Sequence, residues 1–173
     1  LQMSSIYQAL ANDGVRVEPR LIKKITSADG TELGAEPAKE TQVVSPETAR
    51  TTVDMFRAVT QSDETGVQQG TGAPAAIKGY QVSGKTGTAQ QIDPNTGAYS
   101  NSSYWITFAG IAPSDKPRFV VGIMLDNPQR GTDGGAGGTA APLFHDIMSW
   151  MLDHYNVPLS EKAGPKLMLE ANR

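Results

Sequence analysis

The sequence predicts an α/β (α+β) fold in which an antiparallel sheet is packed by helices. Three runs of strand-forming residues follow one another between positions 80 and 126, and polar turns rather than helices separate them, which favours antiparallel pairing. Segments with the apolar spacing of a helix stand before and after these runs. The length of 173 residues, with 38% hydrophobic and 19% charged residues, suits one soluble domain with its own core.

The chain opens with a predicted helix over residues 1–14. Asn12-Asp13-Gly14 is a typical helix stop, and no capping residue precedes Leu1. Because an initiator methionine is also missing, we expect the chain to be a piece of a longer protein. The apolar residues at helical spacing are Met3, Ile6, Tyr7 and Leu10.

Residues 15–33 predict a β-hairpin around the turn Ala28-Asp29-Gly30, and residues 34–41 a polar connection. A second helix is predicted from Ser45-Pro46-Glu47, which combines a capping residue, a proline at the first helical position and an early acid. For the glycine-rich residues 61–76, a solvated connection is favoured over a functional loop. The expected buried stripe of the second helix consists of Ala49, Val53, Phe56, Ala58 and Val59.

The first strand of the predicted sheet contains residues 83–89, because strand formers recur there and just before it. A polar loop is expected over residues 90–103 and a second strand over residues 104–112. After a short turn, residues 118–126 predict the third strand. The strand formers around the first strand are Tyr80, Val82, Thr86 and Thr88.

A glycine-rich crossing at residues 131–139 leads to a final predicted helix over residues 141–155, with Pro142 in its first turn. The crossing either flanks a cleft or serves as a flexible connector. We expect one domain over residues 1–158 and a tail over residues 159–173. The expected buried stripe of the final helix consists of Leu143, Ile147, Trp150, Met151 and Tyr155.

Composition excludes several classes of function. A net charge of −3, without a block of lysine or arginine, argues against nucleic acid as the principal partner. No run of apolar residues approaches the length of a membrane span. The absence of cysteine excludes a thiolate nucleophile and a disulfide framework. With His145 and His154 as the only imidazoles, we expect neither a metal site nor a histidine-centred triad, and no cofactor.

The segment from Gly79 to Thr88 fits two motifs with opposite structural demands. Gly79-x-x-x-x-Gly84-Lys85-Thr86 matches a phosphate-binding loop, which needs a strand before Gly79 and a helix that begins at Lys85. The neighbouring residues favour neither that strand nor that helix. The apolar run that ends in Asp126 would suit a magnesium-binding strand, so the nucleotide-binding alternative stays open.

Read as a strand, Lys85-Thr86-Gly87-Thr88 can bind a carboxylate. Lys85 supplies a fixed positive charge, and Thr86 and Thr88 share one face of a strand, where both hydroxyls can donate. Lys85 alternates to the other face, so its ammonium must approach from beneath or along the strand edge. Gly87 leaves room for a peptide backbone, and Gly84 for close packing. A solvated edge lysine between good strand formers is the plainer interpretation.

The combination of motifs resembles the C-terminal part of the transpeptidase domain of class B, monofunctional penicillin-binding proteins. Ser83-Gly84-Lys85-Thr86-Gly87-Thr88-Ala89-Gln90 is similar to the lysine box of that family with its flanks. Residues 108–113 resemble the following strand and its exit, residues 137–144 the entry to the last helix, and residues 1–14 an upstream helix. The resemblance covers essentially the whole chain. Within the family, the chain most resembles the septal division transpeptidases of actinobacteria.

The resemblance implies a penicillin-binding transpeptidase or serine β-lactamase-like fold and a function in peptidoglycan crosslinking by serine acyl transfer. Lys85 and Thr88 would be catalytic, with the Thr88 N–H as one oxyanion donor. Thr86, Gly87 and Thr88 would bind substrate. Residues of a possible pocket are Ala89, Gln90, Tyr104 and Trp105, although an aromatic at a strand start is more often part of a core.

The resemblance also implies partners. These are the peptidoglycan stem peptide, β-lactam antibiotics, and an upstream part of the same protein with the Ser-x-x-Lys and Ser-x-Asn boxes, which this chain lacks. Division or elongation machinery would join them, at the extracytoplasmic face of the bacterial membrane, with an anchor outside this chain. A D,D-carboxypeptidase, a β-lactam sensor and a degenerate binding domain remain alternatives.

Overall fold

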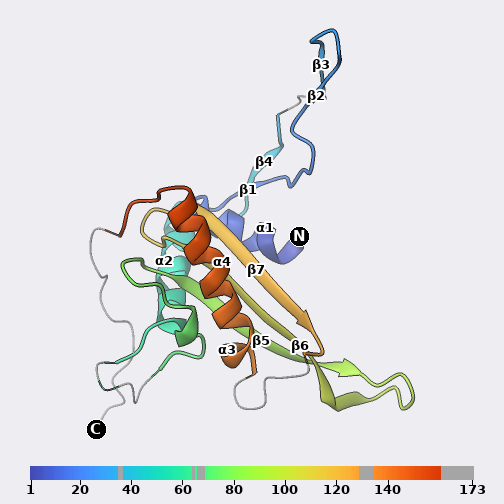
Figure 1. Ribbon diagram of the computed structural model, residues 1–173, viewed down its shortest axis with the longest axis vertical. Coiled ribbons are helices and arrows are strands. Elements are labelled where there is room, and N and C mark those ends of the chain that lie inside the picture. The colour runs from blue at the N-terminus through green and yellow to red at the C-terminus, as the bar shows by residue number, and fades with distance from the viewer. Residues whose placement is uncertain (35–36, 64, 66–68, 129–134, 161–173) are drawn as a thin grey trace.

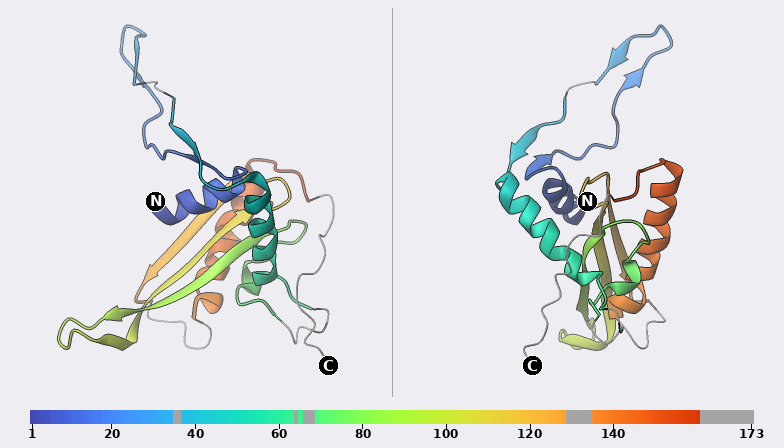
Figure 2. Two further views of the ribbon diagram at one scale, coloured as in Figure 1. Left: turned by 180° about the vertical axis from the view of Figure 1, so that it is seen from behind. Right: turned by 90° about the vertical axis from the view of Figure 1, so that its left-hand side faces the viewer.

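A three-stranded antiparallel sheet forms the centre of the molecule and is covered by helices on both faces. The computed structural model describes residues 1–34, 37–63, 65, 69–128 and 135–160. The sheet consists of β5 (Ser83–Ile92), β6 (Tyr99–Ala112) and β7 (Phe119–Asp126), in that order. Helix α4 (Ala140–His154) lies on one face, and α1 (Gln2–Ala11) and α2 (Pro46–Phe56) lie on the other (Figure 1 and Figure 2). The predicted architecture is confirmed.

Strands β5 and β6 are longer than the sequence predicts. Residues 90–103 were expected to be a polar loop, but β5 continues to Ile92 and β6 begins at Tyr99. Figure 1 shows this end of the two strands as a ribbon that extends past the helices. Because solvent reaches the ribbon, its strands carry serine and asparagine without the apolar alternation that marks a half-buried strand. The pairing shifts register between Gln90 and Ile92.

The larger part of the core lies between the sheet and α4. Phe108 of β6 and Phe144 of α4 are both fully buried, and their ring centroids are 4.8 Å apart. A Cβ atom on Gly110 would lie 2.8 Å from Phe144 Cζ, so the absence of a side chain there makes room for the ring. On the opposite face a second cluster holds Tyr7, Val53, Ala109 and Ile111.

The predicted buried stripe of the last helix was wrong. Trp150 is 61% exposed and Tyr155 58% exposed, and Leu143 and Ile147 are more than one-third exposed. A neighbouring face of the helix packs on the sheet instead. Small residues at the start of this face allow the helix to approach the sheet closely, and larger residues follow. That buried face consists of Ala140, Ala141, Phe144, Met148 and Leu152.

The first two helices form as predicted, with smaller buried faces. In α1, Tyr7 is buried, whereas Met3 and Ile6 are more than half exposed. In α2, the Ser45 hydroxyl accepts a hydrogen bond of 3.1 Å from the Thr48 N–H and caps the helix. A short 3-10 turn, η1 (Arg57–Val59), follows α2 directly.

Residues between α1 and α2 form an arm that projects from the body of the molecule (Figure 1). The predicted hairpin is present, with β2 (Ile25–Thr26) paired to β3 (Glu32–Leu33). The arm is nevertheless longer than expected. Strand β1 (Val15–Val17) pairs with β4 (Glu40–Gln42), and β4 begins in the segment that was predicted to be only a connection. Residues 35–36 lie outside the described part of the chain.

The described chain ends on the body of the protein. The Ser160 N–H donates to the Gly79 carbonyl at 3.0 Å, and the Ser160 hydroxyl donates to Asp115 Oδ1 at 2.7 Å. The division into residues 1–158 and a tail from 159 stays a prediction, and residues 161–173 lie outside the described part. Among the described residues, no helix has the length and apolar character that a membrane crossing requires.

Candidate functional site

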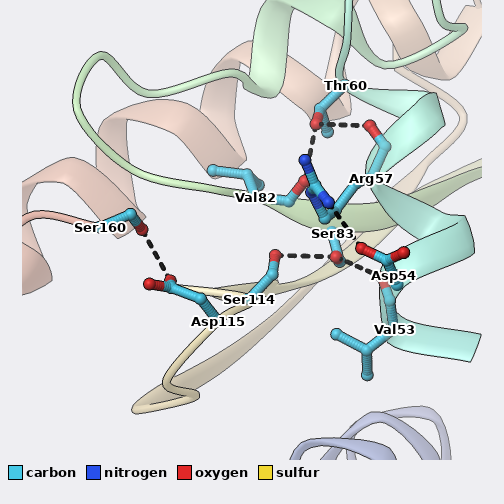
Figure 3. Close-up of polar contacts among 9 residues, drawn as sticks. All are labelled: Val53, Asp54, Arg57, Thr60, Val82, Ser83, Ser114, Asp115 and Ser160. Atoms are coloured by element: carbon cyan, nitrogen blue, oxygen red, sulfur yellow. Dashed lines mark hydrogen bonds and ion pairs between the residues drawn. The ribbon is translucent and has the colours of Figure 1, made fainter. Parts of the chain in front are cut away.

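The lysine box lies on β5, the outer strand of the sheet, and a buried polar network fixes the start of that strand (Figure 3). The Ser83 hydroxyl is fully buried, donates to the Val53 carbonyl at 2.6 Å and bonds the Ser114 hydroxyl at 2.7 Å. The Thr60 hydroxyl donates to the Val82 carbonyl at 2.7 Å. These bonds tie β5 to α2, to η1 and to the turn after β6, and so set the position of the box.

The backbone of Thr86 and Thr88 faces the outer edge of β5. The Tyr104 carbonyl accepts the Asn127 N–H at 2.9 Å, so the Tyr104 backbone points toward β7. Because neighbouring residues of a strand point their backbone groups in opposite directions, the odd-numbered residues of β6 in this stretch face β5. The backbone groups of their partners across the pair, Lys85 and Gly87, therefore point toward β6. The N–H and C=O groups of Thr86 and Thr88 point outward. Within the described residues, no strand pairs with this edge.

The three polar side chains of the box meet at this edge from two faces. Thr86 lies opposite Phe108, which places both threonines on the α4 face, whereas Lys85 lies opposite Ala109 on the other face. The Lys85 ammonium donates to the Thr86 carbonyl at 2.9 Å. Since that carbonyl points outward, the ammonium lies along the strand edge, as the alternation predicts.

Thr71 is the contact of the box that the sequence did not single out. Its hydroxyl lies 2.9 Å from the Thr86 hydroxyl. Residues 69–76 are not the solvated connection that was predicted, because Ala75 is fully buried and a Cβ atom on Gly72 would lie 2.6 Å from the Phe108 ring. The glycines that made the segment appear flexible allow this close packing, and glycine spacing was the one signal for it.

The glycine-rich entry to the last helix also reaches the box. Gly135 begins the short helix α3 (Gly135–Gly138) with a φ of +48°, and a Cβ atom on it would lie 3.3 Å from the Thr88 hydroxyl. Of the two alternatives for this crossing, the one in which it flanks the site therefore fits residues 135–138. Residues 131–134 lie outside the described part.

Gly84 and Gly87 have internal neighbours that exclude a side chain. A Cβ atom on Gly84 would lie 2.5 Å from Phe108 Cζ, which agrees with the expected close packing. A Cβ atom on Gly87 would lie 2.4 Å from the Thr107 hydroxyl. Gly87 was expected to make room for a bound peptide, and the structure adds a steric demand from the neighbouring strand.

The four residues of the possible pocket separate. Tyr104 lines a cavity of about 70 Å³ together with Ile106, Gly135 and Thr139, beside Thr88. Gln90 lies opposite Tyr104, and its amide donates to the Ser100 carbonyl at 3.0 Å. Trp105 and Ala89 lie opposite each other and share the other face of the sheet. Of the four, Tyr104 lines this cavity beside the box.

The nucleotide-binding alternative is wrong. A phosphate-binding loop requires a helix that begins at Lys85, but Lys85 lies within β5, and Gly79 lies in a turn that the Tyr80 N–H closes onto the Ile77 carbonyl before that strand. Asp126 ends β7 and accepts a hydrogen bond of 2.7 Å from the Gln91 amide.

Comparisons with known proteins agree with this geometry. Residues 1–149 match the family described as the penicillin binding protein transpeptidase domain. The chain is 60% identical over 171 residues to penicillin-binding protein PbpB of Mycolicibacterium smegmatis, which covers 99% of this chain and 26% of that protein. It is 34% identical over 158 residues to peptidoglycan D,D-transpeptidase FtsI of Escherichia coli, which covers 91% of this chain and 24% of that protein.

Solved structures agree as well. The crystal structure of penicillin binding protein 3 from Mycobacterium tuberculosis in complex with ampicillin superposes with a TM-score of 0.89 at 55% identity, over 99% of this chain and 38% of that one. The chain spans about a quarter of the length of the curated relatives that it matches. The chain therefore belongs to the penicillin binding protein transpeptidase domain family, in which it resembles the class B proteins of the PbpB type.

Proposed function

We propose that this chain forms the substrate-binding wall of a serine D,D-transpeptidase that crosslinks peptidoglycan. The observation that carries the proposal is the outer edge of β5, where the Lys85 ammonium, two threonine hydroxyls and outward backbone groups come together. The relatives named peptidoglycan D,D-transpeptidase support the same reaction.

The edge suits an extended peptide that ends in a carboxylate. The terminal carboxylate of a stem peptide would lie between the Lys85 ammonium and the hydroxyls of Thr86 and Thr88, which form charge-assisted hydrogen bonds. The peptide backbone would add to the free edge as a further strand. In this pose the outward Thr88 N–H would donate to the oxyanion, and loss of one such donor costs about 3 kcal/mol of transition-state stabilisation.

The nucleophile would come from an upstream part of the same protein. No serine in this chain has a lysine three residues later or an asparagine two residues later. The proposed serine Oγ would bond to the carbonyl carbon of the penultimate D-alanine while the C–N bond to the last D-alanine breaks. The leaving amine takes up a proton, and the amine of a second stem peptide then displaces the serine.

A β-lactam would enter the same site, because its carboxylate and its strained amide correspond to those of the stem peptide. Structures of the similar Mycobacterium tuberculosis protein are described as complexes with ampicillin and with aztreonam. Since the substrate is part of the cell wall, we place the complete protein at the extracytoplasmic face of the membrane, with division or elongation machinery as its partner.

Labelling with a fluorescent penicillin tests the proposal. In the complete protein, Lys85→Ala should slow acylation about tenfold or more, because a charge-assisted hydrogen bond contributes about 1.5–3 kcal/mol. The control is Lys78→Ala, which removes an exposed lysine outside the box and should leave labelling unchanged. Equal labelling of the Lys85 variant and the parent would contradict the proposal.

Product analysis separates the neighbouring activities. With stem pentapeptide and an acceptor amine, a transpeptidase yields crosslinked peptide. A D,D-carboxypeptidase yields trimmed tetrapeptide, and a β-lactam sensor yields neither product although penicillin labels it.

A further inference from the structure

The loop before the box holds Thr71 in one position. The Gly70 N–H donates to the Gln61 carbonyl at 2.8 Å, and the Gly72 N–H donates to the Val59 carbonyl at 2.9 Å. Thr71 stands between these two bonds, so its backbone is fixed on both sides to the segment that follows α2.

Three close approaches fix the loop further. A Cβ atom on Gly70 would lie 2.2 Å from the Val59 carbonyl oxygen, and one on Gly72 would lie 2.6 Å from the Phe108 ring. A Cβ atom on Gly137 of α3 would lie 2.4 Å from the Thr71 carbonyl oxygen. Backbone packing this close leaves little freedom to shift, and it presents the Thr71 side chain to β5.

We propose that Thr71 is a positioning residue for the carboxylate-binding hydroxyl of Thr86. The two hydroxyl oxygens are 2.9 Å apart, and each hydroxyl has one hydrogen to donate. If Thr71 donates to Thr86, the Thr86 hydrogen is left to donate outward to an anion. The anion and Thr71 then polarise the Thr86 hydroxyl in the same sense, which strengthens both bonds. The inference rests on the proposed function of the box.

Thr71 reaches the box through Thr86, and the bond between the two hydroxyls is exposed to solvent. Thr71 touches Thr86, and through Gly137 it touches α3, whose first residue lies beside the Thr88 hydroxyl. One residue thus supports both sides of the pair of threonines.

The test compares Thr71→Val, which keeps the shape and removes the hydroxyl, with Thr71→Ser, which keeps the hydroxyl. The readout is the second-order rate of acylation of the complete protein by a fluorescent penicillin. We expect Thr71→Val to lower this rate about five- to tenfold, the effect of one lost hydrogen bond. Thr71→Ser should stay within about twofold of the parent.

A neutral ligand distinguishes the positioning role of Thr71 from a merely structural role. The methyl ester of the same penicillin lacks the carboxylate charge, so Thr71→Val and the parent should react with it at rates within about twofold of each other. A second check is the pair Thr71→Val and Thr86→Val. Once Thr86 is valine, the Thr71 substitution should have no further effect, because its partner is gone.

Two outcomes would overturn the positioning role: an equal loss of acylation rate with the acid and the ester, or full additivity of the two valine substitutions. Both outcomes count even if Thr71→Val folds poorly, because Thr71→Ser supplies a folded comparison. If Lys85→Ala slows acylation but Thr71→Val does not, this inference fails and the proposed function stands. If Lys85→Ala has no effect, the proposed function itself fails.

Discussion

Ser83→Ala should destabilise the transpeptidase domain through the network that anchors β5. The Ser83 side chain is fully buried and makes hydrogen bonds of 2.6 Å to the Val53 carbonyl and 2.7 Å to the Ser114 hydroxyl. With about 1 kcal/mol for each net hydrogen bond, the loss is about 2 kcal/mol, and a buried carbonyl that loses its partner raises it toward about 3 kcal/mol. In a domain of about 150–250 residues, 2 kcal/mol corresponds to a fall in melting temperature of roughly 4–8 °C, and the fall is smaller in a longer domain.

The measurement is the melting temperature of the transpeptidase domain in the complete protein, followed by calorimetry. The control is Ser149→Ala in α4, because the Ser149 hydroxyl is also buried but has no hydrogen-bond partner among the described residues. Its removal should be neutral or stabilising by up to about 1 kcal/mol, since alanine also has the higher helix propensity. If both substitutions lower the melting temperature equally, burial of the hydroxyl and not its hydrogen bonding controls stability, contrary to this prediction.

Two further predictions test the packing and the box. Leu152→Ala should cost about 2–5 kcal/mol of unfolding free energy, because Leu152 is almost fully buried, whereas Trp150→Ala should cost under about 1 kcal/mol; a larger loss for Trp150 in calorimetry would restore the stripe that the sequence suggested. Gly87→Ala should slow acylation by penicillin, and Thr107→Ala in the same protein should restore part of the rate by removing the hydroxyl 2.4 Å from the new methyl group; no recovery would indicate that a bound ligand, and not Thr107, requires the glycine.

The order of the elements could be predicted because each depends on residues close together in the chain. The cap at Ser45, the alternation around Thr86 and the turn at Asp29-Gly30 are local signals, and the structure confirms the elements that they predict. The length of the β5–β6 ribbon escaped prediction because a solvated ribbon lacks the alternation that a sequence displays. The pairing of β1 with β4 depends on strands far apart in the chain, and no local pattern encodes it.

The buried face of α4 escaped prediction for a different reason. Several faces of this helix carry large apolar residues, so the sequence offers more than one stripe. The choice is made by the sheet, where Gly110 leaves space for the ring of Phe144. Trp150 then turns to the surface and stacks on His154 at a centroid distance of 4.7 Å.

Adjacent residues of the chain are sufficient to specify the strand that carries the candidate site, the two faces on which Lys85 and the threonines lie, and the family. Those properties follow from the period of a strand and from a motif of adjacent residues. The contacts of Thr71 and Gly135 with the threonine hydroxyls, in contrast, depend on how the whole chain folds. These contacts join segments separated by many residues, and they form only where glycines let two backbones approach within the reach of a hydroxyl group.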